Sequence, residues 1–152
     1  MKKLIIFDLD GVIFDSKENM RLSWNDVNRK LNLGIKFNSY FSKIGKPFEK
    51  ILYELKVNKK NIVKAKKIFR HSSINHLNKI KVYPSVISTI KLLKKNNYRT
   101  AIITSKEKYR ALKLLKKFNL RFKYVQCPKK GKKGKPDPFL LNDLVKKIKI
   151  NK

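Results

Sequence analysis

Short and mostly apolar segments mark three strands along this chain. Residues 4–7 are all apolar and end at Asp8, as in a strand that is buried on both faces. Residues 100–104, in which two threonines flank three apolar residues, predict a second buried strand, and residues 124–127, which are apolar apart from Gln126, predict a third and shorter one. Strands of this kind are typical of parallel sheets, whose two faces are both covered by helices.

Apolar residues at helical spacing lie between and after these strands. Ser85 is a suitable N-cap for a helix that ends near residues 96–97. Three helices are expected after residue 84, and the last of them runs to the end of the chain. Their inward positions are Val86, Ile90 and Leu93; Tyr109, Leu112, Leu115 and Phe118; and Phe139, Leu140, Leu144 and Ile148. Residues 128–138 hold three Pro and two Gly, which predicts a loop. Strands that alternate with helices predict right-handed crossovers and a doubly wound α/β sheet.

Residues 16–81 show helical spacing without another convincing strand. The four apolar stripes are Met20, Trp24, Val27 and Leu31; Phe37, Tyr40, Phe41 and Ile44; Phe48, Ile51, Leu52 and Leu55; and Ile62, Ala65, Ile68 and Phe69. We therefore expect a small four-helix insertion at 16–81, set into an α/β core made of residues 1–15 and 82–152.

Two carboxylates follow the first predicted strand. Asp8 and Asp10 alternate along an extended segment and so can face the same way, at the strand end where open α/β sheets bind ligands. Mg²⁺ prefers one or two carboxylates together with water and phosphate oxygens, so it suits such a pair. Gly11 would let the backbone turn beside the ligand. Taken alone, an Asp-x-Asp-Gly segment is more often a turn that closes a strand.

Three segments together resemble the motifs of the haloacid dehalogenase-like phosphatases, in particular the phosphoglycolate phosphatase-like members. They are Phe-Asp-Leu-Asp-Gly-Val-Ile-Phe-Asp-Ser at 7–16, Ala-Ile-Ile-Thr-Ser-Lys at 101–106 and Gly-Lys-Pro-Asp-Pro at 134–138. The resemblance implies a Rossmann-like parallel sheet with a helical cap inserted at 16–81. Gly45, Lys46 and Pro47 lie where such caps often present a loop to the substrate.

The resemblance also implies the chemistry of a Mg²⁺-dependent phosphatase. Asp8 would attack a phosphomonoester and form an aspartyl-phosphate, while Asp10 would protonate the leaving oxygen and later activate water. Both aspartates would hold Mg²⁺, Asp10 through its backbone carbonyl as well. The Thr104 hydroxyl and the backbone N–H of Ser105 would bind the phosphate, and Lys135 would neutralise it together with the nucleophile.

The family pattern continues into a further strand that ends in an acidic pair and supplies another Mg²⁺ carboxylate. This chain ends at Lys152, before such a strand, so we expect a C-terminally truncated form of the fold. Without that strand, residues 4–7 would lie at an exposed edge, which favours pairing with other strands. We therefore expect either a homodimer or a partner chain that covers this edge.

Composition adds an alternative function. Lys and Arg number 40 against 10 Asp and Glu, a net charge of +30. Most of the basic residues are Lys, so we expect a solvated surface with weak nonspecific attraction to polyanions and no specific nucleic-acid site. Cys127 is the one cysteine, which excludes an internal disulfide and suits the cytoplasm. No signal peptide or membrane span is apparent.

The leading hypothesis is therefore a Mg²⁺-dependent hydrolase of a small phosphorylated metabolite, whose activity the short C-terminus could impair. The alternative is a non-catalytic relative that binds a partner or polyanion through its basic surface. A phosphomutase of the same fold is a third reading that the sequence does not separate from a hydrolase. The substrate itself is not readable from the sequence, because cap loops choose it and the fold does not.

Overall fold

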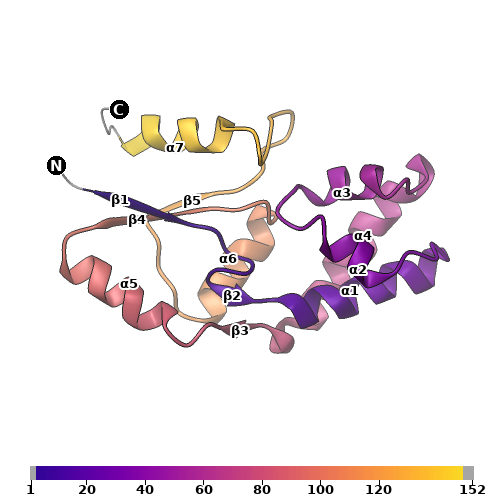
Figure 1. Ribbon diagram of the computed structural model, residues 1–152, viewed down its shortest axis with the longest axis horizontal. Helices are drawn as coiled ribbons and strands as arrows, with labels where there is room; N and C mark the ends of the chain where they lie inside the picture. Colours follow the sequence, from indigo (N-terminus) through magenta and orange to yellow (C-terminus); the bar gives the residue numbers. More distant parts are fainter. Residues whose placement is uncertain (1–2, 149–152) are drawn as a thin grey trace. The chain divides into compact units, whose positions relative to one another are not determined.

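The computed structural model describes residues 3–148 and divides the chain into two compact units (Figure 1). One unit comprises Met1–Asp15 and Val82–Lys152, and the other comprises Ser16–Lys81. We call them the α/β unit and the helical unit and describe each by itself. The end of the last predicted helix, at 149–152, lies outside the described residues.

The α/β unit is built on a three-stranded parallel sheet. Its strands are β1 (Leu4–Phe7), β4 (Arg99–Ile103) and β5 (Tyr124–Gln126), in the order β1-β4-β5. The predicted parallel α/β fold is thereby confirmed. The first strand was expected to be fully buried on both faces. That expectation is wrong, because all four β1 residues are only half-buried. Within the described sheet β1 is an edge strand, so one of its sides lacks the neighbour that would complete its burial.

Helices cover both faces of this sheet. Figure 1 shows α7 (Phe139–Ile148) on one side of the strands and α5 (Val86–Lys95) with α6 (Lys108–Lys117) on the other. The residues buried between the sheet and α7 are Ala101, Ile103, Leu140, Leu144 and Ile148. Alternate residues of β4 face opposite sides, so this one strand contributes to the packing on both faces.

Two sequence expectations for these helices need correction. In α6, Tyr109 and Leu112 are 51% and 44% exposed, while Ala111 and Leu114 are buried. The buried stripe is therefore rotated from the expected one, because the small Ala111 permits close approach and counts as weakly apolar in a sequence pattern. Ser85 stands at the N-cap position of α5, but its side chain makes no capping hydrogen bond.

Two very short strands lie where the chain leaves and re-enters the α/β unit. They are β2 (Phe14–Asp15) and β3 (Lys81–Val82), which pair with each other. The sequence analysis did not expect them, since two residues are too few to show a periodic pattern. The Phe14 side chain is fully buried and packs 5.2 Å, centroid to centroid, from the ring of Phe118.

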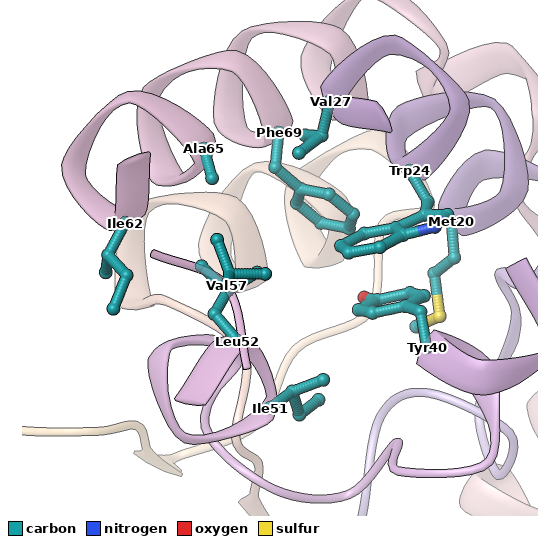
Figure 2. Close-up of a cluster of buried hydrophobic side chains, with 10 residues drawn as sticks. All are labelled: Met20, Trp24, Val27, Tyr40, Ile51, Leu52, Val57, Ile62, Ala65 and Phe69. Atoms are coloured by element: carbon teal, nitrogen blue, oxygen red, sulfur yellow. The ribbon is translucent and has the colours of Figure 1, made fainter. Parts of the chain in front are cut away.

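The helical unit contains the four α-helices that its periodicity predicts. They are α1 (Lys17–Leu31), α2 (Phe37–Phe41), α3 (Phe48–Glu54) and α4 (Lys59–Asn75), followed by the 3₁₀ helix η1 (Leu77–Lys79). Figure 2 shows their buried side chains converging on one core. The rings of Trp24 and Tyr40 are stacked there, with their centroids 4.6 Å apart. The core is Met20, Trp24, Val27, Tyr40, Ile51, Leu52, Val57, Ile62, Ala65 and Phe69.

Among residues 3–148, no helix is both long enough and apolar enough to cross a bilayer.

Candidate active site

The candidate residues lie at the end of the sheet where the parallel strands have their carboxyl ends. Phe7 of β1 stands opposite Ile102 of β4, so Asp8 and Thr104 both follow the ends of neighbouring strands. The N–H of Thr104 donates to the carbonyl of Gln126 at 3.0 Å, which continues the β4 to β5 pairing by one residue. Ligands of open α/β sheets bind at this end of the strands.

The Asp8 carboxylate has a partner on each oxygen. Its Oδ1 accepts a hydrogen bond from the N–H of Leu9 at 2.7 Å, and its Oδ2 lies 2.9 Å from the ammonium of Lys135. Both side chains of this ion pair are 28% exposed. The structure thus brings together two residues that the sequence assigns to one site and that lie near opposite ends of the chain.

A tight loop after β1 fixes the backbone around Asp10. The Leu9 carbonyl accepts hydrogen bonds from the N–H groups of Ile13 and Phe14, at 3.0 and 2.9 Å. Gly11 has a φ of +79°, which L side chains rarely adopt, so glycine suits this turn. The Asp10 carboxylate is 14% exposed and lies 3.0 Å from the ammonium of Lys106.

Lys106 is a site residue to which the sequence analysis gave no role. Its side chain is 2% exposed, and its ammonium contacts Asp10. Burial lowers the pKa of this ammonium, while the negative charge of Asp10 opposes that shift. Its place just after a buried strand was a signal, but a buried lysine cannot be distinguished by type from the many exposed ones in this sequence.

Thr104 and Ser105 directly precede Lys106 in the sequence. The Thr104 side chain is buried, and its Oγ1 accepts a hydrogen bond from the N–H of Lys106 at 3.0 Å. A hydroxyl that accepts in this way still has its own hydrogen to donate elsewhere. Ser105 is half-buried. Thr104 therefore has the donor that phosphate binding would require.

The acidic residues that follow Lys135 are engaged in structural contacts. The Oδ1 of Asp137 accepts from the N–H of Phe139 at 2.9 Å, at the start of α7. Oδ2 of Asp143 accepts from Gln126 at 2.7 Å and from Lys129 at 2.9 Å. The hydrogen bond from Lys129, with help from other partners, lowers the pKa of the Asp143 carboxyl.

The predicted substrate loop lies in the helical unit. The ammonium of Lys46 is 2.8 Å from both carboxylate oxygens of Glu54, and Gly45 has a φ of +104°. Lys46 therefore holds the loop to the end of α3. That Gly45, Lys46 and Pro47 face a substrate stays a prediction, as does the role of the helical unit as a cap.

The carboxylates at the carboxyl ends of the strands are few, but they fit a Mg²⁺ ion. Within residues 3–148 there is no group of three or more His, Cys, Asp or Glu side chains that could hold a metal ion. Mg²⁺ needs only one or two carboxylates when water and phosphate oxygens complete its shell. Asp8 and Asp10, both partly exposed at the strand end, are suitable in number and kind.

Comparison with known families gives one match that extends over nearly the whole chain. The profile of a family described as haloacid dehalogenase-like hydrolase matches residues 5–152. A comparison with curated proteins yields no match.

Solved structures of the same fold are similar over almost all of this chain. A protein of Haemophilus somnus 129PT, described as a predicted phosphoglycolate phosphatase, is 23% identical with a TM-score of 0.83, covering 98% of this chain and 72% of its own. A hydrolase from Pseudomonas syringae is 23% identical with a TM-score of 0.87, at 99% and 72% coverage. CbbY from Rhodobacter sphaeroides, solved with phosphate, is 16% identical with a TM-score of 0.80, at 99% and 74%. At these identities the likeness establishes the fold.

Proposed function

The chain belongs to the haloacid dehalogenase-like hydrolase family, and from this premise we propose that it is a Mg²⁺-dependent phosphatase of a small phosphorylated metabolite. The observation that carries the proposal is the pairing of Asp8 with Lys135 at 2.9 Å, at the end of the sheet where Thr104 also lies. A carboxylate beside an ammonium and a hydroxyl donor suits the transfer of a phosphoryl group.

In the proposed reaction, a carboxylate oxygen of Asp8 attacks phosphorus in line. The bond from phosphorus to the leaving oxygen breaks, and Asp10 gives that oxygen a proton. Water then attacks the aspartyl-phosphate, gives a proton back to Asp10, and releases inorganic phosphate and the free Asp8 carboxylate. Lys135, the Thr104 hydroxyl and the Ser105 N–H offset the charge on the phosphoryl oxygens throughout.

Asp8 and Asp10 would hold Mg²⁺ in this proposal. The ion would supply positive charge that neutralises the phosphoryl oxygens and favours the attack of one anion on another. The two aspartates are already paired with Lys135 and Lys106, so metal binding would compete with or rearrange these contacts.

The helical unit would act as the cap that selects the substrate, with Gly45, Lys46 and Pro47 toward it. The cytoplasm is the proposed compartment, since one cysteine without a disulfide suits a reducing environment. The family match favours the hydrolase over the non-catalytic alternative.

Hydrolysis of p-nitrophenyl phosphate with and without Mg²⁺ tests the proposal. We expect Mg²⁺-dependent turnover that Asp8→Asn abolishes and that Glu49→Gln, which removes an exposed carboxylate of α3, leaves unchanged. Mass spectrometry of acid-quenched enzyme should find the phosphoryl group on the peptide that contains Asp8. No turnover at any Mg²⁺ concentration, with salt-sensitive RNA binding that survives Asp8→Asn, would instead favour the polyanion-binding alternative.

A further inference from the structure

Lys106 occupies an unusual position for a lysine in this protein. Its side chain is 2% exposed, although the chain carries 40 Lys and Arg residues that a solvated surface accommodates easily. Burying an ammonium is costly unless an anion and good geometry compensate it. The Asp10 carboxylate, 3.0 Å away, provides that anion. The pair therefore needs an explanation beyond the general abundance of lysine.

The two lysines of the site differ in what they offer a substrate. Lys135 is 28% exposed beside Asp8, so a phosphate can approach its ammonium from solution. Lys106 is almost fully covered, and its ammonium is directed at Asp10. The geometry thus separates a lysine suited to bind phosphate from a lysine suited to hold a carboxylate.

Lys106 also links Asp10 to the predicted phosphate-binding threonine. Its N–H donates to Thr104 Oγ1 at 3.0 Å, while its ammonium contacts Asp10. On the other side, the loop that begins at Leu9 fixes the backbone of Asp10 through the N–H groups of Ile13 and Phe14. One residue thereby fixes the carboxylate of Asp10 relative to Thr104.

We propose that Lys106 is a positioning residue, which holds the Asp10 carboxyl group in the orientation from which it protonates the leaving oxygen. This inference rests on the proposed function and adds a residue to it. Proton transfer requires donor and acceptor within hydrogen-bond reach, so a carboxyl group free to rotate would be correctly placed for only part of the time. Lys106 itself touches neither the phosphoryl group nor the leaving oxygen in this scheme.

Two substrates of similar size and different leaving groups test the role. The nitrophenolate of p-nitrophenyl phosphate is a weak base that departs without a proton, whereas the alkoxide of benzyl phosphate needs one. For Lys106→Met we expect kcat to fall about 30-fold to 100-fold with benzyl phosphate, at or just below the smallest contribution of general acid catalysis, because Asp10 itself is still present. With p-nitrophenyl phosphate we expect a loss below about threefold, and KM should stay unchanged for both substrates.

The Asp10→Asn background shows whether Lys106 acts through Asp10. In Asp10→Asn enzyme, adding Lys106→Met should cause no further loss with benzyl phosphate, because the group being positioned is already absent. Lys106→Arg keeps a cation beside Asp10 and should recover part of the benzyl phosphate rate. It replaces Lys106→Met as the test variant if Lys106→Met does not fold. Lys116→Met removes an exposed lysine of α6 and should leave both rates unchanged.

Any of four results would overturn the inference. Equal losses with both substrates, or a rise in KM, would make Lys106 a phosphate ligand. Independent losses from Asp10→Asn and Lys106→Met would show that the lysine does not act through Asp10. A wild-type enzyme that hydrolyses neither substrate would refute the proposed function and the positioning role with it. An active wild type whose Lys106 variants lose activity equally with both substrates would refute the positioning role alone.

Discussion

One ion pair of the helical unit and one of the α/β unit lie in different surroundings. In the helical unit, Glu18 and Arg21 pair with both side chains 46% exposed. In the α/β unit, Lys106 is 2% exposed and its partner Asp10 is 14% exposed. Exposed pairs contribute little to stability, and a buried pair must overcome a large desolvation cost. The helical unit is thus stabilised by its apolar core, whereas the pair of Lys106 with Asp10 in the α/β unit has a reason in the proposed reaction that stability does not give it.

Removing a core ring from the helical unit should give the largest effect. Phe69 is 3% exposed, and its ring centroid lies 4.4 Å from that of Phe48. We expect Phe69→Ala to lower the free energy of unfolding by about 4 kcal/mol, since it removes buried apolar surface and leaves a cavity. Urea unfolding followed by tryptophan fluorescence measures this directly, because Trp24 is the one tryptophan and lies in the same core.

The matched control for that prediction is an exposed ring of the same unit. Tyr53 is 50% exposed, so Tyr53→Ala should change the free energy of unfolding by less than about 0.5 kcal/mol. Similar losses in the Phe69 and Tyr53 variants would contradict the view that the buried core stabilises this unit.

The architecture was largely predictable because hydrophobic periodicity determines it. The short apolar segments at 4–7 and 100–104 are typical of buried strands, and the carboxyl ends of parallel strands meet at one end of the sheet. The family resemblance assigned Thr104 to the same site as Asp8, and the parallel pairing of β1 with β4 agrees with that assignment. Lys135 required the family resemblance, since a loop with many lysines gives no reason to choose one of them.

The contact between Lys106 and Asp10 was not predictable, because sequence patterns describe burial for apolar residues and not for lysine. A different limit explains the rotated face of α6. Tyr109 and Leu112 are strongly apolar in sequence yet exposed, and Ala111 is buried. Which side of a helix meets a sheet depends on how closely the backbones approach, and small residues decide that approach.

Removing Lys135, the more exposed of the two lysines of the site, should affect catalysis and not stability. We expect Lys135→Met to lower kcat/KM about 300-fold, roughly 3 kcal/mol of transition-state stabilisation, as when one preorganised donor to a developing charge is lost. The urea midpoint should remain unchanged, because the pair with Asp8 is 28% exposed on both sides. Lys133→Met, at a lysine that is 82% exposed, is the control and should leave kcat/KM as it is. A stability loss in Lys135→Met as large as its catalytic loss would remove the distinction between the units.

A structural ion pair of the α/β unit should show a smaller effect that depends on pH. Asp143 contacts Lys129, Lys147 and Gln126, and its pKa lies below the ordinary 3.8. A lowered folded pKa stabilises the fold above the unfolded pKa, and this contribution is lost as pH falls through the folded value. Asp143→Asn should therefore reduce the free energy of unfolding by about 1 kcal/mol near neutral pH. The difference from wild type should shrink below about pH 4, and a difference that grows on acidification would be the wrong sign.

The smallest effect is expected at the loop that the sequence assigns to substrate recognition. Lys46 is 38% exposed and already bound to Glu54, so its ammonium has a partner within its own unit. Lys46→Met should shift the melting midpoint by less than about 2 °C and raise KM by no more than about threefold, with kcat unchanged. Differential scanning fluorimetry and steady-state kinetics measure both quantities, and Lys66→Met, at another exposed lysine paired with a glutamate, is the control. A KM increase of about 30-fold or more in Lys46→Met, but not in Lys66→Met, would mean that the pair of Lys46 with Glu54 opens to bind substrate. The helical unit would then hold a functional charge, as is proposed for the α/β unit.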